Sequence, residues 1–440
     1  MTEIMQRTTF SIISLGCPKN TVDSEMLSGK LQSLGCVYRA NPEEAEIVIV
    51  NTCGFIEQSR AESIETIFET LKLKETGSVR KVFVMGCLTQ RYGDLLRKEI
   101  PEADRIDGVH SIDAIVEAIA RKKSSCADEE SRALLTPSHL AYLKIAEGCD
   151  NSCAFCSIPL IRGKQQSRDV KSLIKEAEYL HRKGVKELIL IAQDLTRYGS
   201  DLPGKVRLIV LLEELLQTDL FPWVRLMYNH PDFWLPELNR LFEKYSALVP
   251  YIDIPIQHAS DRILKLMNRG KNREEIRHVL KTIRNEAPRV VLRTSVMVGF
   301  PSETEADFNE LLDFIEEIRF ERLGVFTYSQ EEGTSAANLR DDVPHEEKER
   351  RKEIVMRLQW DISHEFALNQ VGKTLDVLIE EKKPEGYVGR SVWDAPEIDC
   401  SVLVNSENVL QIGEIATVAI DEVQELDLIG HVVGKIQDRT

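Results

Sequence analysis

Short apolar runs alternate with amphipathic stretches along the first 135 residues of the chain. The runs predict strands, and the stretches between them carry apolar residues at helical spacing. Strands that alternate with helices form a parallel sheet, so we expect a parallel-sheet α/β domain over residues 1–135. The expected strands are residues 10–15, 46–51, 81–85 and 105–108, and the expected helices are 22–34, 58–73 and 91–98.

The middle of the chain, residues 136–368, repeats this alternation on a larger scale. Six strand–helix units are too few for a closed eight-fold barrel, so we expect an open (βα)6 partial barrel. Loops with polar residues or glycine follow each strand, at the edge where chemistry sits in such barrels. The expected strands are residues 142–146, 187–192, 223–228, 251–256, 290–298 and 322–328, separated by helices such as 170–183, 274–285 and 307–318.

The spacing of apolar residues changes in the last segment, residues 369–440. A charged helix at 345–369 leads into it, and short strands with turns between them suggest a small antiparallel β-barrel. A stretch rich in charge, Ser and Ala at 121–138 is expected to be a linker between the first two domains. The strands expected in the last segment are residues 374–380, 402–404, 415–420 and 428–433.

Composition and charge narrow the classes of function. The 440 residues are 42% hydrophobic and 29% charged, which is ordinary for a globular protein. No apolar run approaches the roughly 20 residues needed to span a bilayer, and the N-terminus lacks a secretory signal, so we expect a cytoplasmic protein without a membrane partner. The net charge of −16 disfavours a protein that coats nucleic acid and suits a basic protein or a small substrate.

Three cysteines form a compact C-x3-C-x2-C motif directly after the first strand of the partial barrel. They are Cys149, Cys153 and Cys156. Clustered cysteines in a reducing compartment indicate metal binding, and three thiolates on one loop can hold three irons of a cubane cluster. The fourth iron then stays open, as in a catalytic metal site. The alternative is a structural zinc site or an electron-transfer cluster completed by a fourth cysteine; no second C-x2-C pair, the usual zinc pattern, lies nearby.

The motif resembles that of the radical-SAM superfamily, in which an aromatic residue, here Phe155, precedes the last cysteine. The resemblance implies that S-adenosylmethionine chelates the open iron and is cleaved to methionine and a 5′-deoxyadenosyl radical. Other strand ends should then hold the rest of this cofactor, although polar loop residues are commonly just solvated. The residues expected there are Gln193, Asp194, Gln257, His258 and Gly299.

A second set of cysteines lies in the N-terminal segment, at Cys17, Cys53 and Cys87. Each follows an expected strand, and ligands of parallel sheets bind outside the carboxyl ends of the strands. Adjacent parallel strands lie about 4.8 Å apart, so three such cysteines can converge on one cluster. The alternative is that they are ordinary core cysteines. The remaining cysteines, Cys36, Cys126 and Cys400, lack this placement and are expected not to be ligands.

Two sets of three cysteines give the whole chain a resemblance to the methylthiotransferases, which replace a C–H hydrogen with a methylthio group. The resemblance implies two 4Fe-4S clusters and S-adenosylmethionine as cofactors, and a TRAM-like C-terminal domain. One S-adenosylmethionine would provide the methyl group and another the radical, while the N-terminal cluster would carry the sulfur. A non-catalytic iron–sulfur carrier is the alternative outside this family.

The family modifies either a tRNA adenosine or an aspartate of ribosomal protein twelve of the small subunit. The motifs Gly16-Cys17-Pro18-Lys19-Asn20 and Cys53-Gly54-Phe55-Ile56 resemble the ribosomal-protein type, and the resemblance implies modification at the aspartate β-carbon. Residues 371–440 hold 14 acidic against 6 basic residues, which suits a basic ribosomal protein, free or on the subunit, better than RNA. The acidity could also serve solubility alone, and a tRNA substrate is the alternative. We further expect an electron donor such as flavodoxin and a monomeric chain.

Overall fold

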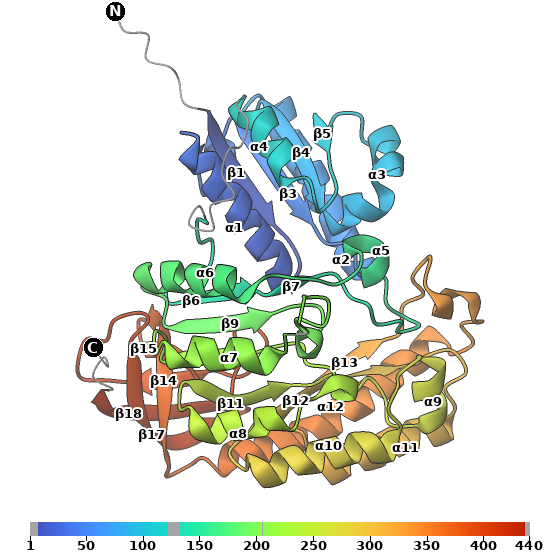
Figure 1. The fold of residues 1–440 in the computed structure, drawn as a ribbon, viewed down its shortest axis with the longest axis vertical. Coiled ribbons are helices and arrows are strands. Elements are labelled where there is room, and N and C mark those ends of the chain that lie inside the picture. Colours follow the sequence, from blue (N-terminus) through green and yellow to red (C-terminus); the bar gives the residue numbers. More distant parts are fainter. Residues whose placement is uncertain (1–7, 122–131, 205, 436–440) are drawn as a thin grey trace, which may run out of the picture.

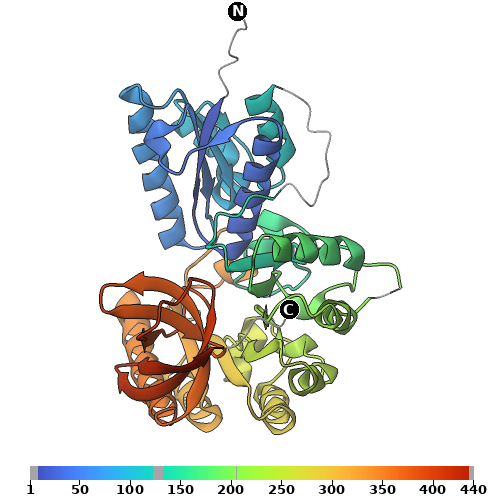
Figure 2. The ribbon, with the colours of Figure 1, turned by 90° about the vertical axis from the view of Figure 1, so that its left-hand side faces the viewer.

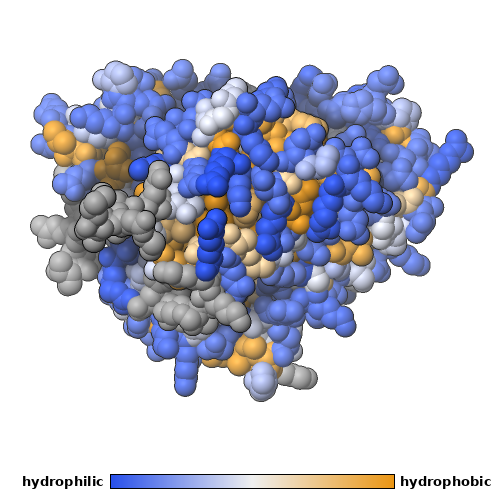
Figure 3. Space-filling model, turned by 90° about the horizontal axis from the view of Figure 1, so that it is seen from above, coloured by the Kyte–Doolittle hydropathy of each residue, from blue (hydrophilic) through white to orange (hydrophobic). Residues whose placement is uncertain are grey.

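The computed structural model describes residues 8–121, 132–204 and 206–435, which form three large sheets, one small two-stranded sheet and their helices (Figure 1). The N-terminal sheet stands above the central one, and the C-terminal barrel lies beside the central sheet (Figure 2). Seen from the N-terminal side, the surface is mostly hydrophilic and is broken by small hydrophobic areas (Figure 3). No helix in the described ranges is long and apolar enough to cross a membrane.

The N-terminal domain is a five-stranded parallel sheet in the order β2-β1-β3-β4-β5. All four predicted strands are confirmed; the short strand β2 and the helix α4 were not predicted. Helices α1 and α3 also begin four residues earlier than predicted. Their first turns bury polar or cysteine side chains, so apolar residues do not recur there at helical spacing. The elements are β1 (Thr9–Ser14), α1 (Pro18–Ser33), β2 (Val37–Tyr38), β3 (Ile47–Thr52), α2 (Glu57–Glu75), β4 (Lys81–Gly86), α3 (Cys87–Glu99), β5 (Arg105–Ile106) and α4 (Ile112–Ala120).

The central domain confirms the predicted open partial barrel. Its six strands are all parallel, in the order β13-β12-β11-β10-β9-β6, and within the described residues the edge strands β6 and β13 do not pair. The strands are β6 (Leu140–Lys144), β9 (Glu187–Ile191), β10 (Trp223–Leu226), β11 (Leu248–Asp253), β12 (Val291–Val298) and β13 (Arg322–Thr327). The helices are α5 (Ile158–Arg162), α6 (Val170–Arg182), α7 (Leu208–Gln217), α8 (Glu237–Lys244), α9 (Asp261–Leu266), α10 (Arg273–Glu286), α11 (Glu305–Ile318) and α12 (His345–Leu368), and β7 (Ala146–Glu147) pairs with β8 (Gln166–Ser167) outside the main sheet.

The C-terminal domain is a closed five-stranded barrel in the order β14-β15-β16-β18-β17. Two details differ from the prediction: β15 was missed, and the pair β16–β18 is parallel while the others are antiparallel. In strand β15, a Cβ at Gly389 would lie 2.5 Å from the Leu378 carbonyl oxygen, so this position requires glycine. The glycine interrupts the alternation of apolar and polar residues by which a strand is predicted. The strands are β14 (Thr374–Lys383), β15 (Gly386–Ser391), β16 (Val402–Asn405), β17 (Ile415–Gln424) and β18 (Asp427–Lys435).

The C-terminal barrel packs against one face of the central sheet. A shared apolar cluster joins Tyr142 and Tyr251 of that sheet to Leu378 and Ile415 of the barrel. The buried carboxylate of Glu187 accepts hydrogen bonds from Arg225 of the central sheet and from Arg390 of the barrel. The two domains are therefore fixed to each other by apolar contacts and by a buried charge cluster.

Candidate functional site

The first set of cysteines lies at the carboxyl edge of the N-terminal sheet. Cys17 follows β1, Cys53 follows β3, and Cys87 begins α3 directly after β4, and these three strands are neighbours. The Cys17 thiol interacts electrostatically with the thiols of both Cys53 and Cys87. Gly16 adopts φ +87°, and a Cβ there would lie 2.9 Å from the Cys53 Sγ. The structure thus brings the three cysteines together at one edge of the sheet.

Two polar side chains that the sequence analysis missed lie beside Cys87. Asn20 donates hydrogen bonds to the carbonyls of Leu15 (2.9 Å) and Thr52 (3.0 Å), which ties together the ends of β1 and β3. Arg162 of α5 donates from Nη2 to the Cys87 Sγ at 3.5 Å. Burial raises the pKa of the Cys87 thiol to about 11, so at neutral pH this sulfur is a thiol unless a metal replaces its proton. Asn20 stands within the first cysteine motif, but no local signal marks Arg162.

The second set of cysteines lies on one loop after β7. Cys156 interacts electrostatically with both Cys149 and Cys153. Burial raises the pKa of the Cys149 thiol to about 11 and that of Cys156 to about 12, so both are protonated thiols in the absence of metal. Arg269 Nη1 donates to the Cys153 Sγ at 3.7 Å. Gly148 begins the loop at φ +72°, where a Cβ would lie 2.1 Å from a backbone carbonyl oxygen.

Backbone hydrogen bonds fix the course of this loop. The Cys149 N–H donates to the Gly163 carbonyl at 3.1 Å, and the Ala154 N–H donates to the Met267 carbonyl at 2.9 Å. The Ala154 carbonyl in turn accepts from the Ala336 N–H at 2.8 Å. Segments after α5, α9 and β13 therefore hold the cysteine loop at the carboxyl edge of the central sheet.

The chemistry of the two cysteine sets suits iron–sulfur clusters. Within the part of the chain that the structure describes, no three His, Cys, Asp or Glu side chains are grouped so as to hold one metal ion. A cubane cluster makes another demand, because each thiolate binds a different iron and the sulfur atoms surround the whole cluster. Thiolate is also the ligand that such clusters select. Each set thus offers three suitable ligands and leaves a fourth iron for another group.

Gln193 and Asp194, after β9, lie next to the cysteine loop. The Gln193 Nε2 donates to the Glu147 Oε1 at 2.7 Å, while its own Oε1 is buried and has no hydrogen-bond partner among the residues that the structure describes. The Asp194 carboxylate accepts from Asn151 Nδ2 at 2.7 Å and from the Thr196 N–H at 3.0 Å. Burial raises the pKa of this carboxyl group. The orphaned Gln193 oxygen is an acceptor that a ligand with polar hydrogens could use.

Gln257 and His258 follow β11 and are placed differently from each other. Gln257 has φ +70°, and its N–H donates to the Ser295 carbonyl at 3.0 Å, which holds this loop against β12. His258 is fully buried, and its Nδ1 accepts from the Ser260 N–H at 2.9 Å. Its Nε2 lies 3.9 Å from the Glu303 Oε1. The ring of His258 therefore faces the interior behind the loop.

Gly299 and Phe155 complete the expected contacts. Gly299 has φ +72°, and a Cβ there would lie 2.2 Å from the Lys348 Cγ, so the tight turn after β12 requires glycine. Phe155 packs with Met267 and Phe300 in a small apolar cluster. This cluster includes Ala154 as well, so it anchors the cysteine loop by apolar packing.

Two of the other cysteines lie in the described part of the chain, and each has surroundings different from those of the two sets. Cys36 belongs to the apolar core of the N-terminal domain. Cys400 lies in the C-terminal domain near Arg322, and burial raises the pKa of its thiol to about 12. Cys126 and most of the expected linker lie outside the described residues.

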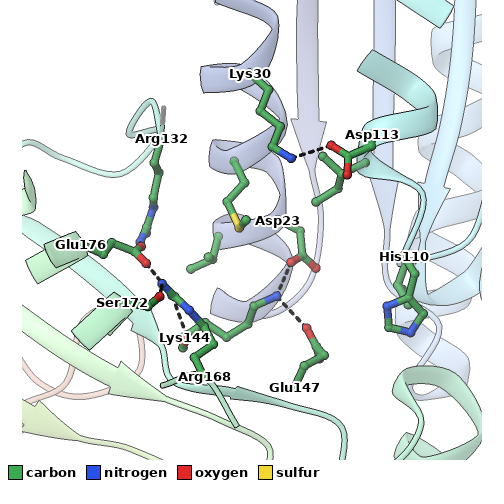
Figure 4. Close-up of a pocket in the computed structure, with 14 residues that line it drawn as sticks. Asp23, Lys30, His110, Asp113, Arg132, Lys144, Glu147, Arg168, Ser172 and Glu176 are labelled. Atoms are coloured by element: carbon green, nitrogen blue, oxygen red, sulfur yellow. Dashed lines mark hydrogen bonds and ion pairs between the residues drawn. The ribbon is translucent and has the colours of Figure 1, made fainter. Parts of the chain in front are cut away.

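A charged network joins the two cysteine sets across the domain interface. Arg162 Nη1 donates to Asp23 Oδ2 at 2.8 Å and to Glu147 Oε2 at 2.9 Å, and Lys144 pairs with the same two carboxylates. Asp23, Lys144 and Glu147 meet (Figure 4), and they line a cavity of about 410 Å3 to which residues of α1 and α6 also contribute. Although burial opposes ionisation, Lys144 and Arg162 lower the pKa of Glu147 below its usual range. The network continues through Glu147 to Gln193.

Each domain matches a known family. Residues 143–315 match the radical SAM superfamily, residues 9–108 match the uncharacterized protein family UPF0004, and residues 371–433 match the TRAM domain. The fold is similar to that of the radical S-adenosylmethionine methyltransferase TsrM from Kitasatospora setae, with a TM-score of 0.54, 13% identity and coverage of 76% of this chain and 77% of that one. Fold, motif and family matches define the chain as a radical-SAM protein with an additional cysteine-bearing domain.

Curated relatives narrow this class. The ribosomal protein uS12 methylthiotransferase RimO of Clostridioides difficile (strain 630) is 46% identical over 436 residues, which cover 96% of this chain and 98% of the relative. The protein of the same name from Cytophaga hutchinsonii is 42% identical and covers 97% of this chain and 98% of the relative. The chain belongs to the RimO family.

Proposed function

We propose that this chain is a transferase that places a methylthio group on the β-carbon of an aspartate in ribosomal protein uS12. The observation that carries the proposal is the presence of two three-cysteine sets on facing domains, joined through Arg162. The names of the curated relatives supply the substrate, and the motifs around Cys17 and Cys53 agree with them. A tRNA adenosine substrate would share the chemistry and is the outcome that the test below must separate.

In this proposal Cys149, Cys153 and Cys156 hold the radical-SAM cluster, and Cys17, Cys53 and Cys87 hold the second cluster. When bound, the clusters and S-adenosylmethionine supply the radical, the methyl group and the sulfur. Around the first cluster, Gln193 would offer a buried acceptor to the cofactor, and Gly299 would shape the turn after β12 through its positive φ. The remaining expected contacts are Phe155, Asp194, Gln257 and His258, of which His258 would act from behind its loop.

The same proposal implies a compartment, an electron donor and an oligomeric state. A ribosomal substrate, free or on the small subunit, places the protein in the cytoplasm, and an electron donor such as flavodoxin would reduce the clusters. We propose that the chain acts as a monomer. We also retain the division into a cluster domain (1–135), a partial barrel (136–368) and a TRAM-like domain (369–440).

The deciding experiment is an anaerobic assay of the reconstituted full chain with a uS12 peptide that contains the target aspartate. Mass spectrometry should detect a methylthio adduct on that aspartate and no adduct on tRNA offered in the same reaction. A matched peptide with asparagine at the target position is the control and should stay unmodified. An adduct on tRNA alone would contradict the proposal.

Two independent cluster sites predict a definite iron content. Because each set of three cysteines holds four irons, anaerobic reconstitution should give about eight irons per chain. Replacement of Cys149, Cys153 and Cys156 by alanine should leave about four, as should replacement of Cys17, Cys53 and Cys87. Colorimetric iron analysis with absorption spectroscopy measures this. Loss of all iron in either variant would show that the sites depend on each other.

The acidic C-terminal domain is expected to help capture a basic substrate. Asp421, Glu422 and Glu425 are exposed on the hairpin of β17 and β18, whereas Asp427 accepts a hydrogen bond from the Ser401 N–H at 2.8 Å and should be left unchanged. Lysine at the first three positions should raise the apparent KM for the uS12 peptide several-fold, because long-range attraction is lost. Uncoupled 5′-deoxyadenosine formation should hardly change.

A matched variant tests whether position or total charge matters. Glu65, Glu69 and Glu75 are exposed on α2 of the N-terminal domain, and lysine there changes the net charge equally. This control should leave the KM nearly unchanged, because salt screens charges beyond about 8 Å at physiological ionic strength. Equal effects of both variants would contradict docking at the C-terminal hairpin.

A further inference from the structure

Each set of cysteines receives a hydrogen bond from one arginine. Arg269 donates to the Cys153 Sγ, and it belongs to the central domain like the cysteine itself. Arg162 donates to the Cys87 Sγ, but it lies in the central domain while the cysteine lies in the N-terminal one. The N-terminal cysteine set is thus completed by a donor from the domain that carries the other set.

Arg162 is held rigidly in this position. Its side chain is 2% exposed, and Asp23 and Glu147 accept hydrogen bonds from Nη1. Nη2 is thereby turned to the Asn20 Oδ1 at 2.5 Å and to the Cys87 Sγ. Because the planar guanidinium has fixed donor directions, two bound carboxylates on one nitrogen determine where the other points.

The backbone at Arg162 is equally constrained. It is the last residue of α5, which follows the radical-SAM cysteine loop, and the next residue, Gly163, accepts the N–H of Cys149. Any shift of the cysteine loop would therefore move the guanidinium. Lys144 balances the two carboxylates, so the network is neutral overall and its positive end faces Cys87.

A buried positive charge that donates to a cluster sulfur stabilises the reduced, more negative cluster. Hydrogen bonds to the sulfurs and exclusion of solvent are two of the factors that set the potential of such clusters. The effect is strong where water is excluded, because electrostatic interactions are then weakly screened. We propose that Arg162 is a positioning residue that raises the reduction potential of the N-terminal cluster from across the domain interface, as Arg269 does within the central domain for the radical-SAM cluster.

This inference rests on the proposed cluster sites, and reciprocal variants test it. Full-length chains with only one cluster are made by replacing either Cys149, Cys153 and Cys156 or Cys17, Cys53 and Cys87 with alanine. In each background the midpoint potential is measured by anaerobic titration with dithionite, followed by electron paramagnetic resonance. Arg162→Gln should lower the potential of the N-terminal cluster and leave that of the radical-SAM cluster unchanged. Arg269→Gln should do the opposite.

Two further variants separate tuning from general damage. Arg162→Lys keeps the charge but loses the planar fork, so its potential should lie between those of the native residue and glutamine. Arg168→Gln removes a nearby arginine that pairs with Glu176 and donates no hydrogen bond to a cysteine of the described residues, and it should shift neither potential. Iron content and circular dichroism report cluster assembly and folding for each variant.

The outcomes are distinct. Equal shifts of both potentials by Arg162→Gln, or no shift of either, would overturn the inference. If Arg162→Gln lost its iron, the reduction potential of the N-terminal cluster in Arg162→Lys would be the test. A potential equal to that of the native residue would overturn the inference. A failure of the parent single-cluster chains to bind iron would instead contradict the proposed cluster sites.

Discussion

A chain with alanine at Cys17, Cys53 and Cys87 is expected to cleave S-adenosylmethionine and yet to form no methylthiolated peptide. The three thiols lie at the edge of the N-terminal sheet, while the radical-SAM loop is anchored by hydrogen bonds within the central domain. Removal of the first set therefore leaves the second loop in place. Product should fall to the detection limit, because the proposed carrier of the sulfur is lost.

Both products are measured in the same anaerobic reaction. Liquid chromatography quantifies 5′-deoxyadenosine, and mass spectrometry quantifies the modified uS12 peptide. Cys400→Ala is the matched control, since this cysteine lies in the C-terminal domain away from both sets. The control should form product at close to the native rate. Product at the native rate in the triple variant would remove the N-terminal cysteines from the mechanism.

Replacement of Glu187 by glutamine is expected to destabilise the contact between the central domain and the C-terminal barrel. Its carboxylate is fully buried and accepts from Arg225 Nε at 2.6 Å and from Arg390 Nη2 at 2.5 Å. Glutamine leaves two buried guanidinium groups with too little negative charge, although Glu380 still pairs with Arg390. Loss of one partner of a buried ion pair costs about 3–5 kcal/mol of unfolding free energy.

Urea denaturation followed by circular dichroism measures this loss. Glu237→Gln provides the control, because Glu237 and Arg207 form an ion pair in which both side chains are about half exposed. Such surface pairs contribute roughly 0–1 kcal/mol. A loss at Glu187 no larger than that at Glu237 would show that the buried cluster does not hold the two domains.

The same carboxylate predicts the acid sensitivity of this contact. Burial alone would raise its pKa, but Arg225 and Arg390 lower it from 4.5 to about 2 in the folded protein. The ionised form therefore contributes stability above pH 4.5, and this contribution is lost as the pH falls through the folded value. The difference in unfolding free energy between the native chain and Glu187→Gln should narrow over that interval.

Features that depend on a local pattern of residues could be predicted from the sequence. The central strands of both parallel sheets are short apolar runs, and the cysteines are recognisable by spacing and by their place after strands. Strand β15 escapes because Gly386 and Gly389 permit close packing and interrupt the alternation. The parallel pairing of β16 with β18 depends on barrel closure, which no single strand encodes.

The parts of the site that could not be predicted depend on contacts between distant segments. Arg162 and Asp23 are separated by 139 positions, and each alone looks like an ordinary charged residue on a helix. Likewise Glu187 and Arg390 are 203 positions apart. Their burial with a partner of opposite charge is a property of the assembled domains, so only the fold reveals it.

Arg132 pairs with Glu25 of the N-terminal domain and with Glu176 of the central domain, and all three side chains are buried. If the N-terminal domain were replaced by that of a distant relative, the pair of Arg132 with Glu176 would be broken. The pair of Arg162 with Asp23 would be broken as well. Charges of this kind must be inherited as matched sets, since either half alone leaves a buried ion without a counterion. Exchange of whole domains within the family is therefore constrained at a few interface positions.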